Sequence, residues 1–328
     1  MFGRNRSAAE PPAPPATFEA ARDSLRPRVF SRTQRALQDL ETELAAGPAG
    51  VPDSAQPVVL PVTEEIALGA VLADSGIIVS RALIETWQVT VAEVIAAASR
   101  SVGGREFTEI GLARPGTYLV GEPDLIGGIL ADPELLSGFD IDSAPLIVPI
   151  ATDALLVTGS QDVAGMIAAL AVVDNAIERG ERLVSNRPLL LGPEGWSAAD
   201  WPEDAELAAR AGYVDARWAG AVYGWQKPLL QRRYAAVGQQ VWVAELYAMS
   251  DEERTFTLTA WTQGVTTALP VAELVSLVTD DGETLLVRWD RLLAEQGALL
   301  TDTGLVPPRY LTEGFPPAEW VARLRGGE

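Results

Sequence analysis

The chain has 328 residues, 48% of them hydrophobic, and its 45 acidic and 25 basic residues give a formal net charge of −20. It has no histidine and no cysteine, and Lys227 is its only lysine. These absences exclude Ser-His-Asp and Cys-His catalysis, zinc sites made of His and Cys, and disulfide frameworks. We therefore expect no cofactor and no metal, and the acidic body should repel nucleic acid.

Hydropathy predicts a cytoplasmic protein. The longest apolar runs, such as Ala164–Val173, are about ten residues long, whereas a helix that spans a bilayer needs about 20. Prolines 11, 12, 14 and 15 occupy the place where the apolar part of a secretory signal would begin. Neither a membrane span nor a secretory signal is therefore expected.

The first 56 residues predict an arm followed by two helices. Residues 1–16 are rich in proline, and we expect them to be disordered. Residues 1–35 carry seven arginines against three acids, so this basic arm could bind an acidic surface or stay solvated. In the segment 17–56, Thr17 can cap a short helix. A second helix is predicted over Val29–Ala46, and the Gly/Pro-rich linker Gly47–Pro57 follows it.

Residues 57–202 predict one α+β domain. The expected strands are Val58–Val62, Ile66–Asp74, Thr117–Val120, Ala144–Ala151, Ala154–Thr158 and a hairpin between Leu189 and Trp196. The expected helices are Ser80–Ser101, Asp124–Leu130 and Asp162–Glu178. The two apolar runs around Thr152-Asp153 predict an antiparallel pair that is buried on both faces. The fold class is therefore α+β, with helices packed on a mixed or antiparallel sheet.

Residues 203–328 predict a second α+β domain, with antiparallel strands and many tryptophans, since eight of the nine tryptophans lie from Trp196 onward. A long helix is predicted to Val237, kinked or broken at Pro228. The expected strands are Gln240–Ala248, Arg254–Thr262, Glu273–Val278 and Thr284–Trp289, with a turn at Asp281-Gly282 between the last two. In the second of these strands, Phe256, Leu258 and Ala260 alternate with threonines. Short helices over Arg291–Glu295 and Pro317–Leu324 complete the predicted elements.

Part of the central domain resembles a known family. Three segments are similar to the YtpQ-like bacterial family. They are LPVTEEIALGAVLADSGIIVSRALIETWQVTVAEVIAAASRSV at 60–102, the segment 116–171 that begins with GTYLVGEPDL, and RPLLLGPEGW at 187–196. Individual residues that carry the similarity are Trp87, Asp153 and the turn Thr158-Gly159-Ser160. The resemblance covers residues 57–202 and implies an α+β fold. The function of that family is not known, so it implies no active site.

Several polar groups are candidates for a metal, anion or catalytic site, and each also has a purely structural interpretation. Asp140 and Asp142 could hold a divalent cation or lie in a solvated loop. The acids at 200, 203, 204 and 206 could act as acid and base or stabilise a helix N-terminus. The turn from Thr158 to Asp162 could bind an anion or cap a helix. Lys227 could serve Ser-Lys catalysis only if it were desolvated, and its neighbours indicate an exposed position.

Aromatic and basic residues gather on the predicted long helix. They are Arg217, Trp218, Tyr223, Trp225, Arg232, Arg233 and Tyr234. Such a set could form a surface for a partner. Alternatively, the aromatic rings could pack in the core, with the arginines extending to solvent. Gly220 and Gly224 would allow another element to approach closely.

We therefore expect a non-enzymatic protein-interaction module that acts as a scaffold or regulator. Its protein partner would meet the tryptophan-rich half or an acidic face, and the net charge favours a basic partner. One alternative is a sensor of a small ligand in a pocket lined by Trp and Tyr. The other is a carboxylate-based, metal-assisted hydrolase, which needs two acids converging in a pocket.

Overall fold

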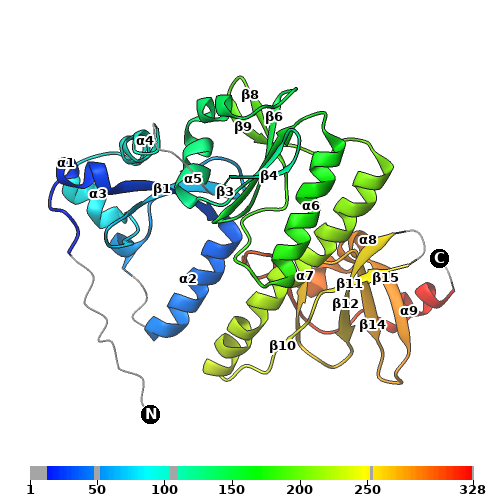
Figure 1. Ribbon diagram of the computed structural model, residues 1–328. Coiled ribbons are helices and arrows are strands. Elements are labelled where there is room, and N and C mark those ends of the chain that lie inside the picture. The colour runs from blue at the N-terminus through cyan, green and yellow to red at the C-terminus, as the bar shows by residue number, and fades with distance from the viewer. Residues whose placement is uncertain (1–12, 48–51, 104–109, 252–253, 327–328) are drawn as a thin grey trace, which may run out of the picture.

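The computed structural model describes residues 13–47, 52–103, 110–251 and 254–326. Helices and strands are interleaved, and the described strands form four sheets. The α+β class predicted from the sequence is therefore confirmed. Figure 1 shows the long helix α7 (Ala205–Ala236) between the N-terminal part and the C-terminal sheets. Residues 1–12 of the arm predicted over residues 1–16 lie outside the described residues.

The N-terminal sheet joins two segments that are separated by the predicted linker. Its three antiparallel strands have the order β1 (Leu25–Ser31), β3 (Ile66–Leu72) and β2 (Leu60–Pro61). Residues 25–28 were not expected to be a strand, and Pro27 is tolerated because β1 lies at the edge of the sheet. The predicted helix Val29–Ala46 therefore begins later, as α2 (Arg32–Ala46), with Ser31 as its N-cap. The domain boundary expected between residues 56 and 57 therefore falls between β1 and β2, which belong to the same sheet.

Four helices among the described residues surround this sheet. They are the short α1 (Phe18–Ala21), α3 (Arg81–Trp87), α4 (Val91–Arg100) and α5 (Pro123–Ala131). Of these, α4 and α5 pack directly on its strands. The single helix predicted over Ser80–Ser101 is divided, because Gln88 adopts the left-handed region with φ 56°. Thr90 and Glu93 then form a capping box that starts α4.

The central sheet has six antiparallel strands. Their order is β4 (Ile110–Arg114), β5 (Thr117–Val120), β7 (Ala154–Gly159), β6 (Pro145–Ala151), β8 (Leu189–Gly192) and β9 (Gly195–Ala198). On one face, Leu146 and Leu156 pack against α6 (Val163–Glu178). On the other, Ile147 and Leu155 join the core of the N-terminal sheet. The prediction of an antiparallel pair buried on both faces is confirmed.

Helix α7 continues through Pro228 without a break. One side of it packs on α6 through Leu207, Ala211 and Val214. The other side approaches the C-terminal strands, and a side chain at Gly220 would lie 3.5 Å from the Leu246 carbonyl. Close approach is therefore confirmed at Gly220. A side chain at Gly224 would meet no other atom within 4 Å, so no element approaches there.

The C-terminal lobe consists of two four-stranded sheets. One has the order β10 (Trp242–Val243), β13 (Thr267–Pro270), β17 (Arg309–Thr312) and β16 (Leu300–Asp302). The other has the order β11 (Tyr247–Ser250), β12 (Thr255–Thr262), β14 (Leu274–Val278) and β15 (Thr284–Arg288). Pairs β10–β13 and β12–β14 are parallel, so this half is mixed rather than wholly antiparallel. The strand predicted over Gln240–Ala248 is divided into β10 and β11, and β13, β16 and β17 were not predicted.

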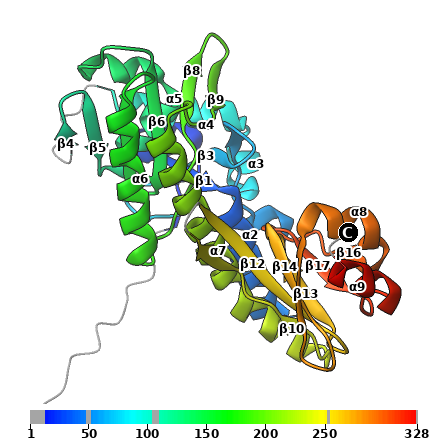
Figure 2. The ribbon, with the colours of Figure 1, turned by 90° about the vertical axis from the view of Figure 1, so that its right-hand side faces the viewer.

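Two helices complete this lobe, α8 (Trp289–Gln296) and α9 (Ala318–Arg325). Figure 2 shows both on the side of the lobe away from α7. Trp261, Leu277 and Trp320 are buried in its core. The hairpin predicted at Asp281-Gly282 joins β14 to β15, with Gly282 at φ 81°. Within the described part of the chain, no helix combines the length and the apolarity needed to cross a bilayer.

Candidate protein-interaction surface

The seven residues proposed on α7 do not face one common surface. Arg217 forms ion pairs with Asp174 and Glu178 of α6. Trp218 is partly buried against the core shared by α6 and the central sheet. These two residues therefore join α7 to α6, as expected if the aromatic and basic residues of the helix serve packing within the protein.

Tyr223 faces the C-terminal lobe and belongs to a buried polar network. Its hydroxyl donates to the Pro308 carbonyl at 2.8 Å and accepts from the Val271 N–H at 3.1 Å. Burial raises the pKa of Tyr223 to about 12. Nearby, the side chain of Gln226 is fully buried and donates to the Pro307 carbonyl at 2.9 Å.

The centre of this network is Arg309 in β17, which is 0% exposed. Its guanidinium donates to the Gln226 side-chain oxygen at 2.5 Å and to the carbonyls of Ala244 at 2.8 Å, Ala268 at 2.9 Å and Tyr223 at 3.3 Å. Among the described residues it forms no ion pair. Burial lowers the pKa of Arg309 to about 10. No sequence signal distinguishes this arginine from the exposed ones.

The remaining four proposed residues lie further along α7. Arg233 is 3.5 Å from the Glu43 carboxylate of α2. Tyr234 packs beside Leu40 and Val243, and burial raises its pKa. Arg232 is exposed. Trp225 borders a cavity between α2 and α7. The structure thus distributes the proposed set over α6, α2 and the C-terminal lobe.

Two acids serve as helix caps, as their structural interpretation predicts. Asp162 accepts from the Gly165 N–H at 3.0 Å at the start of α6 and pairs with Arg114 at 2.5 Å. Burial opposes ionisation of Asp162, but hydrogen bonds from Gly165, Thr158, Thr117 and Arg114 lower its pKa. Asp204 caps α7 in the same way, accepting from the Leu207 N–H at 2.9 Å.

The side chain of Lys227 is only 19% exposed, although the sequence indicated an exposed position. Its amine pairs with Glu245 at 2.5 Å and lies 5.5 Å from the centre of the Trp242 ring. The reason is that α7 packs beside the segment that precedes β11, which covers the lysine stem. A charged amine held by a carboxylate is not a catalytic base.

One pair of acids interacts electrostatically beside the central sheet. Burial raises the pKa of Asp215; Arg187 opposes the rise and Glu65 adds to it. The Asp215 carboxylate accepts from the Asn186 amide at 2.5 Å and lies 3.4 Å from Arg187. Protein groups thus engage both of its oxygens. Among the described residues no set of three acids could hold a metal, and Asp140 and Asp142 belong to none.

The outer face of the sheet β11–β12–β14–β15 carries several large apolar side chains among polar ones such as Ser276 and Arg288. On β12, Thr259 and Trp261 are fully buried and point to the core of the lobe. Phe256 and Leu258 therefore point to the opposite, outer face, because side chains alternate along a strand. This is the reverse of the usual pattern, in which threonines face solvent and Phe and Leu face the core.

Registered neighbours extend this outer face across the sheet. Met249 pairs with Phe256. Leu258 pairs with Tyr247 on one side and Leu274 on the other, and Ser276 pairs with Ala260 and Leu286. Tyr247 is 49% exposed, Met249 42% and Leu286 60%. We call the residues Tyr247, Met249, Phe256, Leu258, Leu274 and Leu286 the outer-face patch. Phe256, Leu258 and Leu274 are half-buried between the exposed residues. An apolar surface patch of this kind can mark an interaction site.

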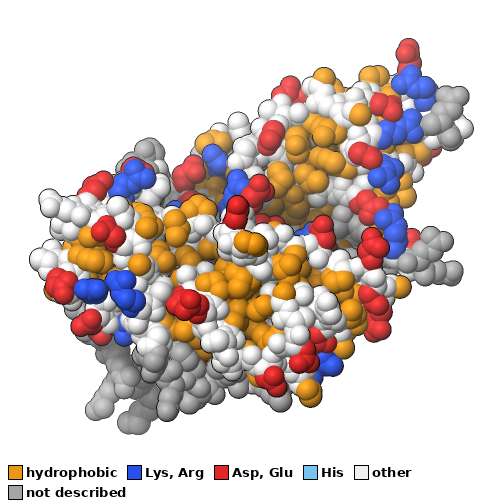
Figure 3. Space-filling model, turned by 90° about the horizontal axis from the view of Figure 1, so that it is seen from above, with side chains coloured by type: hydrophobic (Ala, Val, Ile, Leu, Met, Phe, Trp, Pro, Cys, Tyr) orange, Lys and Arg blue, Asp and Glu red, His pale blue; other side chains and the backbone are white. Residues whose placement is uncertain are grey.

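The patch ends at an open strand. β11 pairs only with β12 among the described strands, and all four of its residues are exposed, although α7 also packs against this strand. Beside it, the Tyr247 hydroxyl donates to Glu245 at 2.6 Å, and the Trp242 ring is 58% exposed. Figure 3 shows exposed hydrophobic side chains over both parts of the molecule and a surface hollowed between them.

Comparison with known proteins adds no relative. No protein-family model, curated protein or solved structure matches the chain. The function is therefore argued from the residues of the chain itself.

Proposed function

We propose that the chain is a cytoplasmic, non-enzymatic protein-binding module that receives an extended segment of a partner protein along β11. The observation that carries the proposal is the reversed polarity of β12. Thr255, Thr257 and Thr259 lie on its core side, and Phe256 and Leu258 face outward, so the outer-face patch is apolar without serving the core of the lobe. A protein places such side chains outward at a cost in solubility, which a binding role explains.

The edge of β11 is suited to strand addition. Sheet edges in proteins are usually protected by proline, lysine, a bulge or a covering element, because free N–H and C=O groups pair with other chains. The sequence of β11 is Tyr-Ala-Met-Ser, which contains none of the protective residues, and its register with β12 has no bulge. An added strand would pair with this edge, and its alternate side chains would extend the outer-face patch.

Charge favours a neutral or basic partner over a second copy. The chain carries a net charge of −20, so two copies brought edge to edge would repel each other. A foreign segment with apolar residues at alternate positions and basic residues between them would meet both the patch and the acidic body. This combination defines the partner that we expect.

A displayed library of random nine-residue peptides, selected on the purified chain, tests the proposal. We expect the recovered binders to alternate apolar and neutral or basic residues. Met249→Lys, in the centre of the open edge, should lower their affinity about ten-fold or more, because it buries a charge against the peptide. The matched control is Leu60→Lys, which makes the same kind of change at an exposed edge strand, β2, of the N-terminal sheet.

The proposal fails if no peptide is enriched, or if binding is equally sensitive to both variants. It also fails if sedimentation shows a dimer of the wild-type chain that Met249→Lys dissociates, because the occupant of the edge would then be a second copy. The resemblance of residues 57–202 to the YtpQ-like family stays a prediction, and the proposed function uses no property of that family.

A further inference from the structure

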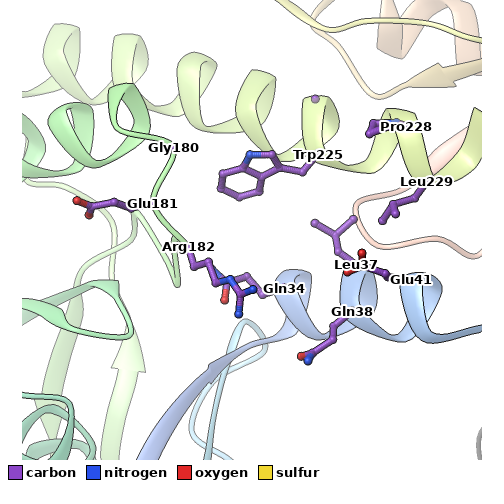
Figure 4. A pocket seen from close by; sticks show the side chains of 11 residues that line it. Gln34, Leu37, Gln38, Glu41, Gly180, Glu181, Arg182, Trp225, Pro228 and Leu229 are labelled. Atoms are coloured by element: carbon purple, nitrogen blue, oxygen red, sulfur yellow. The ribbon is translucent and has the colours of Figure 1, made fainter. Parts of the chain in front are cut away.

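A second feature, distant in sequence from the outer-face patch, has the properties of a small-molecule site. A cavity of about 480 Å³ lies between α2, α7 and the loop that follows α6. Pockets for small organic ligands have volumes of about 300–1,000 Å³. Figure 4 shows the residues around it, which are Gln34, Leu37, Gln38, Glu41, Gly180, Glu181, Arg182, Gly224, Trp225, Pro228 and Leu229.

One wall of the cavity is aromatic and apolar. Trp225 comes from α7, and Figure 4 shows its indole ring in the space between α7 and α2. Leu37 of α2 and Leu229 of α7 border the same space. An indole beside aliphatic side chains offers a flat surface on which a planar ring can stack.

The helix wall beside Trp225 is open for a specific reason. Pro228 has no N–H and cannot donate the helical hydrogen bond to the Gly224 carbonyl, which is left as an acceptor. Gly224 has no side chain, and one placed there would meet nothing within 4 Å. The backbone of α7 is therefore accessible from the cavity.

The charges at the cavity are arranged asymmetrically. Arg182 forms no ion pair with any residue in the described ranges, whereas the nearby Arg179 pairs with Glu181 at 2.5 Å. Figure 4 shows Arg182 beside Gln34, with Glu41 further along α2, next to Leu37. The Gln34 amide donates to the Leu183 carbonyl, which fixes that end of the cavity. One end thus presents the exposed Arg182 guanidinium next to the Glu181 carboxylate, whose charge is offset by Arg179, and the other end presents the Glu41 carboxylate.

We infer that this cavity binds a small planar organic anion. Its ring stacks on Trp225, and its carboxylate or phosphate accepts hydrogen bonds from Arg182, away from Glu41. Guanidinium groups bind such anions through paired donors. Because the net charge of −20 repels anions at a distance, the local attraction must come from Arg182. This inference is independent of the proposed binding of a protein partner.

The test is calorimetric titration of the whole chain with 2-naphthoate and 2-naphthyl phosphate, alongside neutral 2-naphthamide and non-aromatic cyclohexanecarboxylate. We expect the aromatic anions to bind and to raise the melting temperature, and the other two compounds to bind at least ten-fold more weakly. Preference between the two anions identifies the anionic group. Arg182→Gln should weaken binding about ten-fold or more, because it removes a charged hydrogen bond.

Gly224→Leu should abolish binding by filling the cavity. Its matched control is Gly212→Leu on the same helix, which also meets nothing within 4 Å but does not border the cavity. Leucine has a higher helix propensity than glycine, so neither substitution should unfold α7, and a difference in binding between the two variants reflects the cavity. The inference is overturned if the wild-type chain binds neither anion, if 2-naphthamide binds as well, or if Gly224→Leu and Gly212→Leu bind equally.

Discussion

At the scale of single residues, Arg309 supports more structure than its sequence context indicates. Its guanidinium joins β17 to α7 and to the carbonyls beside β10 and β13. Arg309→Met would leave these acceptors unpaired, and we expect it to lower the free energy of unfolding by roughly 3 kcal/mol or more. Urea denaturation measures the change. Arg288→Met, at an exposed arginine, is the control, and equal losses in the two variants would contradict the assigned role.

Asp215 provides a residue-scale prediction about pH. Burial raises the pKa of Asp215 in the folded chain above the usual 3.8. Between pH 3.8 and that raised pKa, the folded chain therefore binds more protons than the unfolded chain. The free energy of unfolding therefore falls as pH rises through this window. Asp215→Asn should remove the fall, so the variant gains stability relative to wild type as pH rises from about 3.8 through the raised pKa of Asp215. Urea midpoints measured across this range test the prediction, and a difference between variant and wild type that does not change with pH would refute the coupling.

At the scale of elements, local signals predicted helix ends better than strands. The capping residues Thr17, Asp162 and Asp204 start helices where expected, because capping depends on a few adjacent residues. β1 and β13 were missed because their partners, β3 and β17, lie far along the chain. Pairing of that kind leaves little trace in a short segment.

The cap of α6 gives an element-scale prediction. Asp162→Ala should lower the free energy of unfolding by about 1–2 kcal/mol, because the Gly165 N–H and Arg114 lose their acceptor. Asp162→Asn should retain most of the cap but lose the ion pair. Since the pKa of Asp162 is lowered, the wild-type advantage over Asn should disappear as pH falls through that lowered value. Thermal unfolding at several pH values checks this, and a wild-type advantage that does not change with pH would contradict it.

At the scale of the whole molecule, the pattern of predicted helices and strands gave the class of fold but not the location of the candidate surface. The aromatic residues of α7 share a helix in sequence, but the helix contacts three neighbours: Trp218 and Trp225 pack on the core with α6, Tyr223 on the C-terminal lobe and Tyr234 beside α2. The outer-face patch was hidden because Phe256 and Leu258 read as core residues. One available signal was Trp261, which lies on the threonine side of β12 and competes with them for the core.

The acidic body, the open edge of β11 and the outer-face patch together define the central claim, which is that a partner segment is added as a strand beside β11. Hydrogen–deuterium exchange of the whole chain, with and without a selected peptide, tests this claim most directly. The account predicts that bound peptide slows amide exchange in residues 247–250 and leaves β2 unchanged. Slowed exchange confined to other elements, with residues 247–250 unaffected, would contradict it.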